Sequence, residues 1–317
     1  MRPPDHTFLD TFAEFGPISR SLSMLIRPTF IAAPGKVLVW GDWAAIEARV
    51  LPWLAQDPDA EKVLDIFRTN DADPDAPDIY VIQGEQLQID AEPKVRRQTG
   101  KVAVLSLGFG GAVGALQNMA TNYGIYLDDA LARRIVDTWR ANNPWARALW
   151  DALWEAALAA MQDPDTIYPV GRVAYVYDKS YLGGTLFCGL PCGRLLTYPA
   201  IRWEKREKEI DGKVVERTEL TCLRGYGRTG LWYGKLAENV TQATAASILR
   251  RSLRLLDDSD SVIGHTHDEI LLEVDEAMET EARRELNSVM LSADAWMDGL
   301  PLAVELFSNW YYTKAGD

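Results

Sequence analysis

The stretch GHTHDEILLEV, from Gly264 to Val274, sets two adjacent carboxylates inside a run that is otherwise typical of β-structure. Asp268 and Glu269 follow two of the chain's three histidines, and the apolar residues on either side favour two short strands joined at the acidic pair. Aspartate is a preferred turn residue, so a hairpin turn with Glu269 in water explains the turn. A turn does not explain why two carboxylates are adjacent here, and a functional role for the pair stays open.

A second acidic position follows the stretch KVLVWGD, which favours a short buried strand from Lys36 to Asp42 before a helical pattern that starts at Ala44. Asp42 could simply cap that helix. Alternatively, two strand ends bring Asp42 and Asp268 to one edge of a sheet. Clustered carboxylate oxygens are the ligands that Mg²⁺ needs when it is also held by a phosphate, so a two-metal phosphoryl-transfer site is possible there.

Positive charge is concentrated in KVRRQTGKVAVLSLGFG, where Arg97 and Lys101 lie four residues apart and share one helix face. Leu105 and Phe109 continue the same stripe. A cationic face of this kind could hold the phosphates that the acidic site would act on. The alternative is a solvated helix face with Phe109 in the core.

The remaining periodicity predicts a chain that alternates between helical and strand-rich regions. Pro93 favours the start of a helix, and residues 57–77 favour a loop around one short helical piece. The other expected elements are a helical region over 127–161 broken near Asn143 and Pro144, hairpins over 168–229 with a turn at Asp211 and Gly212, and helices over 235–256 and 276–297.

The composition is that of a globular protein, with 317 residues, 47% hydrophobic and 25% charged. A net charge of −13 argues against indiscriminate binding of polyanions but leaves room for a locally basic groove. Cys188, Cys192 and Cys222 support neither a disulfide framework nor a zinc site, so buried free thiols are expected. No apolar run reaches membrane-spanning length and no signal peptide is evident, which predicts an intracellular protein without a membrane partner.

Three motifs in this order resemble the C-terminal polymerase region of family A DNA polymerases, with a likeness to phage-encoded members. They are GDWAAIEARVLPWLA, RRQTGKVAVLSLGFGG and GHTHDEILLEV. Weaker likenesses are LPCGRLLTYPAI and ENVTQATAAS, so that the resemblance runs from about residue 15 to the end.

The resemblance implies an α+β right-hand polymerase fold, with an antiparallel-sheet palm, mostly helical fingers and no evident thumb or exonuclease domain. It places the first part of the palm in residues 1–58, the fingers with a β-hairpin elaboration in 59–232, and the second part of the palm in 233–317.

The resemblance also assigns roles to individual residues. The implied catalytic residues are Asp42, Asp268 and Lys101, and the implied ligands of two Mg²⁺ ions are Asp42, the backbone of Trp43, Asp268 and, as an outer carboxylate, Glu269. The implied deoxynucleotide-binding residues are Arg97, Lys101, Glu47, Leu105 and Phe109, and the implied DNA-binding residues are Gln242, His267 and Arg194. The chain departs from the family pattern at Leu105, where an aromatic or polar-aromatic residue is usual, and at Phe109, where tyrosine is usual.

The implied activity is template-directed DNA polymerisation in phage-type replication, with primer-template DNA and deoxynucleotides as partners. A separate chain that supplies thumb or exonuclease functions is a further expected partner, and the expected location is the cytoplasm of a bacterial or phage-infected cell. The alternative is a non-catalytic nucleic-acid-binding or assembly subunit of a split polymerase. Glu47 and the His-Asp-Glu motif disfavour an RNA polymerase.

Overall fold

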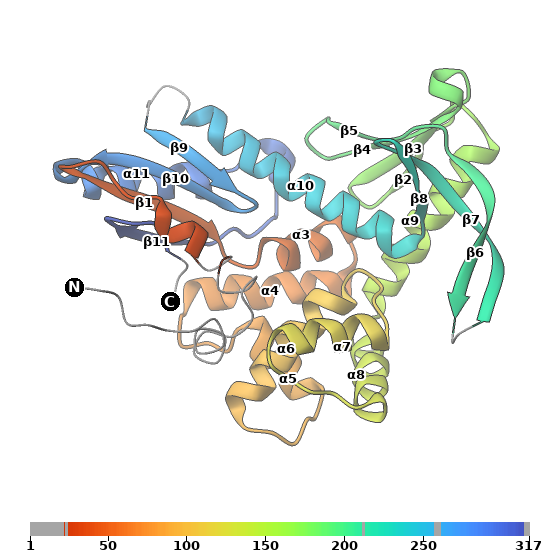
Figure 1. Ribbon diagram of the computed structural model, residues 1–317, viewed down its shortest axis with the longest axis horizontal. Helices are drawn as coiled ribbons and strands as arrows, with labels where there is room; N and C mark the ends of the chain where they lie inside the picture. Colours follow the sequence, from red (N-terminus) through yellow and green to blue (C-terminus); the bar gives the residue numbers. More distant parts are fainter. Residues whose placement is uncertain (1–21, 23–24, 211–212, 257–260, 314–317) are drawn as a thin grey trace, which may run out of the picture. The chain divides into compact units, whose positions relative to one another are not determined.

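A computed structural model describes residues 22, 25–210, 213–256 and 261–313. It confirms the α+β class, with antiparallel sheets and many helices (Figure 1). The chain separates into two units, of which the first contains Met1–Ala44, Leu249–Ser292 and Val304–Asp317. The second contains Ala45–Ile248 and Ala293–Ala303. The boundaries expected for palm and fingers stay predictions.

The first unit is built on a four-stranded sheet in the order β11-β1-β10-β9, with antiparallel pairing throughout. Its strands are β1 (Lys36–Trp43), β9 (Val262–Thr266), β10 (Glu269–Asp275) and β11 (Val304–Asn309), and its helical elements are η1 (Arg27–Thr29), η4 (Glu276–Met278) and α11 (Glu279–Leu291). The expected helix over 276–297 therefore ends at Leu291, and a short 3-10 turn, η5 (Ala295–Met297), follows in the second unit.

Alternation along β1 gives the sheet two different faces. Leu38 and Trp40 pack with Leu271 and Tyr312 in one buried cluster. On the other face Gly41 lies under α11, so closely that a Cβ at this position would meet the sulfur of Met290. Asp42, two residues after Trp40, therefore lies on the face of the buried cluster and not on the face that α11 covers.

Helices make up most of the second unit. Its helices include α3 (Ile46–Ala55), α4 (Pro58–Ala72), α5 (Ile79–Gln86), α6 (Pro93–Leu107), α7 (Val113–Asn122), α8 (Asp129–Asn142), α9 (Pro144–Gln162) and most of α10 (Tyr233–Leu255). The predicted break near Asn143 and Pro144 and the helix start at Pro93 are confirmed.

The expectation for residues 57–77, a loop around one short helical piece, is partly right: residues 73–77 lie outside helices, but the helical piece is α4, which fills most of the range. Asp57 caps α4 by accepting hydrogen bonds from two backbone N–H groups of its first turn, and Pro58 occupies the first helical position, where its missing N–H costs nothing. Ala60, Leu64 and Phe67 bury one face of the helix. Asp57 and Pro58 are thus a helix-start signal, and the residues rich in Asp and Pro at 73–77 form the loop between α4 and α5.

The hairpins expected over residues 168–229 are confirmed as two antiparallel sheets of the second unit. One consists of β2 (Tyr168–Val170), β3 (Val173–Asp178), β4 (Thr185–Gly189) and β5 (Leu195–Tyr198), with η2 (Tyr181–Gly183) in between, and the other of β6 (Arg202–Ile210), β7 (Lys213–Arg224) and β8 (Gly227–Leu231). The predicted turn at Asp211 and Gly212 lies outside the described residues. Cys188 and Cys222 are buried free thiols as expected, whereas Cys192 is only half-buried.

Candidate active site

Antiparallel pairing in the first unit brings together carboxylates that are far apart in the chain. Asp42, near the end of β1, lies opposite Glu269 at the start of β10. One residue further on, the Trp43 backbone N–H donates to the carbonyl oxygen of Asp268, with 3.1 Å between nitrogen and oxygen. We call Asp42, Asp268 and Glu269 the acidic edge. Asp42 lies inside a strand, and the N-cap of α3 is Ala45, so the interpretation of Asp42 as a helix cap is wrong.

The turn between β9 and β10 holds Asp268 at this edge. His267 adopts a left-handed backbone conformation with φ of 32°, which lets the chain reverse between Thr266 and Glu269. Its ring Nδ1 lies 3.5 Å from the Asp268 carboxylate, whose side chain remains one-third exposed. The hairpin turn predicted from the sequence is confirmed, with Asp268 accessible to a ligand from solvent.

Glu269 differs from its two neighbours because it is buried. Its carboxylate accepts hydrogen bonds from Arg27 at 2.9 Å, from Thr266 at 2.8 Å and from the Tyr312 hydroxyl. Burial alone would raise the pKa of Glu269, but these hydrogen bonds and the Arg27 charge outweigh it and lower the pKa below the usual glutamate value. The expectation that Glu269 stands in water is wrong, while its role as an outer metal ligand stays a prediction.

Arg27 and Tyr312 were missed as site residues by reasoning from the sequence. The Arg27 guanidinium lies 4.9 Å from the centre of the Tyr312 ring, so the two residues also contact each other. Burial and the hydrogen bond to Glu269 raise the pKa of Tyr312 to about 12. No local pattern could have revealed the pair, because Arg27 is 242 residues from Glu269 in the chain.

The acidic edge suits a cation that brings further ligands with it. Among residues 22, 25–210, 213–256 and 261–313, no three His, Cys, Asp or Glu side chains are grouped to hold a metal ion. Asp42 and Asp268 nevertheless offer hard carboxylate oxygens on partly exposed side chains. Mg²⁺ is commonly bound by one or two carboxylates, with water and substrate phosphates completing its shell, so the residues present fit this ion.

In the second unit Arg97 and Lys101 project from α6 onto the same neighbours, and we call this pair the cationic face. Arg97 donates to the Asp78 carboxylate from Nε at 2.7 Å, and its Nη2 lies 2.5 Å from the same oxygen. Lys101 Nζ lies 5.8 Å from the centre of the Tyr80 ring and 5.7 Å from that of Tyr123. These contacts make the face more than a solvated helix surface.

Two glycines explain why α5 and α6 approach so closely. A Cβ at Gly100, between Arg97 and Lys101 in the sequence, would lie 2.1 Å from the Tyr80 carbonyl oxygen and 2.7 Å from the Gly84 nitrogen. The helices can therefore touch backbone to backbone. This close packing buries Tyr80 beneath the two cations, where burial first and the Asp78 charge second raise the pKa of its phenol to about 12.

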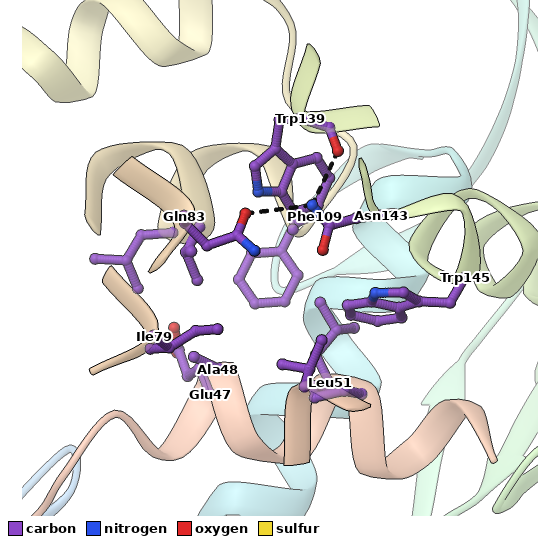
Figure 2. A pocket seen from close by; sticks show the side chains of 14 residues that line it. Glu47, Ala48, Leu51, Ile79, Gln83, Phe109, Trp139, Asn143 and Trp145 are labelled. Atoms are coloured by element: carbon purple, nitrogen blue, oxygen red, sulfur yellow. Dashed lines mark hydrogen bonds between the residues drawn. The ribbon is translucent and has the colours of Figure 1, made fainter. Parts of the chain in front are cut away.

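The next residues along the α6 stripe line a small pocket of the second unit (Figure 2). Leu105 and Phe109 share it with Glu47 of α3, and the Phe109 ring lies in the middle of the view, above α3. On the far side the Asn143 amide donates to Gln83 at 3.3 Å and to the Trp139 carbonyl at 2.9 Å. Three of the predicted nucleotide-binding residues are therefore brought together.

The predicted DNA-binding residues are distributed over both units. Gln242 is exposed on α10 and Arg194 donates to the Ser247 hydroxyl at 2.9 Å, both in the second unit. His267 belongs to the first unit. The DNA-binding role of these residues stays a prediction. Within the described part of the chain, no helix combines the length and the apolar character needed to cross a membrane.

Comparisons with known proteins agree with the motifs. No protein-family profile matches the chain. A DNA polymerase of Bacillus phage SP02 is 32% identical over 310 residues, which cover 95% of this chain and 45% of the phage protein. The polymerase domain of Pol1 from M. smegmatis, solved in complex with DNA primer-template and dNTP, is similar in structure, with a TM-score of 0.55 and 17% identity over 93% of this chain and 43% of that one.

The chain thus spans less than half the length of either protein. The likeness to a DNA polymerase that the motifs indicated and the polymerase-like fold are confirmed.

Proposed function

We propose that this chain is the palm and fingers part of a family A DNA polymerase and adds deoxynucleotides to the 3′ end of a primer under the direction of a template. The observation that carries the proposal is the acidic edge, where a backbone hydrogen bond of 3.1 Å joins the strand end bearing Asp42 to the turn bearing Asp268. The likeness to a phage DNA polymerase over 95% of this chain supports it.

In this proposal Asp42, Asp268 and the backbone carbonyl of Trp43 would hold two Mg²⁺ ions. Such ions supply two effects: they lower the pKa of a hydroxyl that is to attack, and they neutralise charge on transferred phosphates. The backbone bond between Trp43 and Asp268 keeps the two carboxylate-bearing segments in fixed register. Glu269 acts through the turn, because its carboxylate is held by Arg27, Thr266 and Tyr312.

The proposal assigns the triphosphate to the cationic face. Arg97 exchanges its bond to Asp78 for phosphate oxygens, which its fork of donors fits equally well. Lys101 supplies a compact positive charge and gives a proton to the departing pyrophosphate. Tyr80 beneath them is neutral at physiological pH, as tyrosine ordinarily is, and burial raises its pKa further to about 12, so it adds no negative charge that would repel the phosphates.

Selection of the nucleotide is proposed for the pocket shared by Glu47, Leu105 and Phe109. The Glu47 carboxylate disfavours a 2′-hydroxyl on the sugar, and the Phe109 ring offers a face on which a base can stack. Gln242, Arg194 and His267 are proposed to contact the primer-template. Leu105 provides apolar surface without an aromatic ring.

The proposed partners are therefore primer-template DNA and deoxynucleoside triphosphates. We include a further chain that supplies thumb or exonuclease functions as a proposed partner.

Primer extension with Mg²⁺ tests the function directly. We expect the wild-type chain to extend a labelled primer with deoxynucleotides, and Asp268→Asn to lose this activity with an unchanged circular dichroism spectrum. Asp275→Asn is the matched control, because Asp275 is an exposed carboxylate at the other end of β10. The proposal fails if the wild type extends no primer at high enzyme concentration, or if both variants retain equal activity.

A further inference from the structure

A groove in the second unit lies outside every residue assigned to the proposed reaction. It has a volume of about 640 Å³, and it runs between α9 and the three-stranded sheet β6-β7-β8, whose long hairpin is labelled at the right of Figure 1. The residues that line it include Trp154 of α9, Trp203, Arg206 and Arg217 of the hairpin, and Trp232, just before α10. Three tryptophans and two arginines thus face one space.

The tryptophans of the groove have large exposed faces. Trp203 is 50% exposed and Trp232 is 43% exposed, although tryptophan is a residue that folding usually buries. Each is braced by a second ring at right angles to it: Trp203 by Trp154, with 6.3 Å between ring centres, and Trp232 by Tyr233, with 5.0 Å. Braced and exposed rings are suited to stacking against flat ligands.

The arginines of the groove are a like-charge pair, and the Glu219 carboxylate lines the groove with them. Arg206 and Arg217 are direct cross-strand neighbours in the register of β6 and β7, and like charges in this arrangement destabilise a sheet. The Arg206 guanidinium is held by a hydrogen bond of 3.3 Å to the Arg228 carbonyl oxygen. The segment from Arg202 to Leu231 carries eight Lys or Arg and six Asp or Glu residues, a positive balance in a chain whose net charge is −13.

We propose that this groove binds an unpaired DNA strand, with bases stacked on Trp203 and Trp232 and phosphates paired with Arg206 and Arg217. Stacking on aromatic rings combined with cationic contacts to the backbone is the physical basis of binding to single strands without sequence preference. A duplex keeps its bases stacked on each other and cannot offer their faces. The groove therefore distinguishes unpaired from paired DNA.

Binding can be measured without any nucleotide addition. The probe is a fluorescein-labelled oligothymidylate of about 12 nucleotides, a length within the usual range of single-strand site sizes. Binding is measured by the fluorescence anisotropy of the probe, in a buffer that contains a metal chelator and no nucleotide. We expect the 317-residue chain to bind it, and an unlabelled duplex of the same length to compete poorly. Because the assay needs neither Asp42 nor Asp268, its result is independent of the primer-extension test.

Four variants locate the binding. Trp203→Ala and Trp232→Ala should each weaken binding about tenfold or more. The double change of Arg206 and Arg217 to Ala should weaken binding and also reduce the slope of log K against log salt by roughly 1.4, the value for two phosphate contacts to a single strand. Trp203→Phe should retain most of the affinity, because it keeps an aromatic face.

Two controls match these changes. The double change of Arg133 and Arg134 to Ala removes the same charge from an exposed part of α8, and Tyr226→Ala removes an exposed ring beyond the groove, at the turn between β7 and β8. Both should bind like the wild type. The proposal is overturned if the arginine variants of the groove and of α8 weaken binding equally, or if the groove variants, folded as judged by circular dichroism, bind as tightly as the wild type.

Discussion

The acidic edge and the cationic face are built in opposite ways. The cations of Arg97 and Lys101 are brought together by four residues of helix, a local arrangement that any helix of this sequence would reproduce. Asp42 and Asp268 lie on segments far apart in the chain and meet only through the register of β1 and β10. A shift of one residue in that register would turn the side chains of the strand to opposite faces.

The two regions therefore depend on different contacts, and different substitutions should disrupt them. The cationic face depends on close helix packing at Gly84 and Gly100, whereas the acidic edge depends on a buried carboxylate, Glu269, that holds the start of β10. Loss of a charge should therefore reduce the proposed activity in both regions. At the acidic edge it should also affect stability, because Glu269 belongs to a buried polar network.

The largest effect is expected at the acidic edge itself. Asp42→Asn should slow primer extension by about a thousandfold, because it removes a proposed ligand of a metal ion that would stabilise the transition state by several kcal/mol. The measurement is the single-turnover rate at saturating nucleotide. Asp275→Asn, on the same sheet, should leave that rate unchanged, and an equal loss in both variants would contradict a specific role for Asp42.

A smaller effect on the same rate is expected at the cationic face. Lys101→Ala should slow extension by about a hundredfold, the lower end for loss of a positioned proton donor. Lys94→Ala, an exposed lysine in the first turn of α6, is the control and should retain the wild-type rate. If the Lys101 variant is as active as this control, Lys101 has no role in the reaction and the proposed activity rests on the acidic edge.

The comparison also predicts that a substitution of Glu269 lowers the stability of the folded chain. Glu269→Gln should lower the free energy of unfolding by roughly 2 kcal/mol, because the hydrogen bonds from Arg27 and Tyr312 lose their charged acceptor. Urea denaturation measures the change, and Glu285→Gln, exposed on α11, should leave stability unchanged. If both variants have the same free energy of unfolding, the hydrogen bonds around Glu269 do not stabilise the acidic edge.

The same network predicts a pH dependence. The pKa of Glu269 is lower in the folded chain than its usual value of 4.5, so the folded state favours the ionised form. Its contribution to stability is complete above the pKa of the unfolded chain and is lost as the pH falls through the folded value. We expect the difference in unfolding free energy between the wild type and Glu269→Gln to shrink below pH 4.5. A constant difference would contradict this linkage.

The smallest effect is expected in nucleotide choice. Glu47→Ala should reduce the preference for deoxynucleotides over ribonucleotides by about tenfold, the low end of what removing one unfavourable contact achieves. The measurement is the ratio of kcat/KM for the two nucleotide types. Glu85→Ala, an exposed position on α5, should keep the wild-type ratio, and equal ratios in both variants would remove Glu47 from nucleotide selection.

Local patterns were sufficient for much of the fold. Proline placed the starts of α6 and α9, alternation predicted the hairpins, and the acidic pair marked the turn between β9 and β10. The expected helical piece at α4 was too short because Asp57 and Pro58 suit a loop as well as a helix start, and the apolar face of α4 decided between them.

What the sequence determined by itself is the identity of the chemical groups and their local spacing: the strand that carries Asp42, the turn at Asp268, and the helical stripe that carries Arg97 and Lys101. The tertiary structure alone decided that Glu269 is buried and bound by Arg27 and Tyr312, and that tryptophans of a helix, a hairpin and a loop line one groove. The physical reason is range: periodicity acts within a few residues, whereas burial and cross-strand register depend on contacts between segments far apart in the chain.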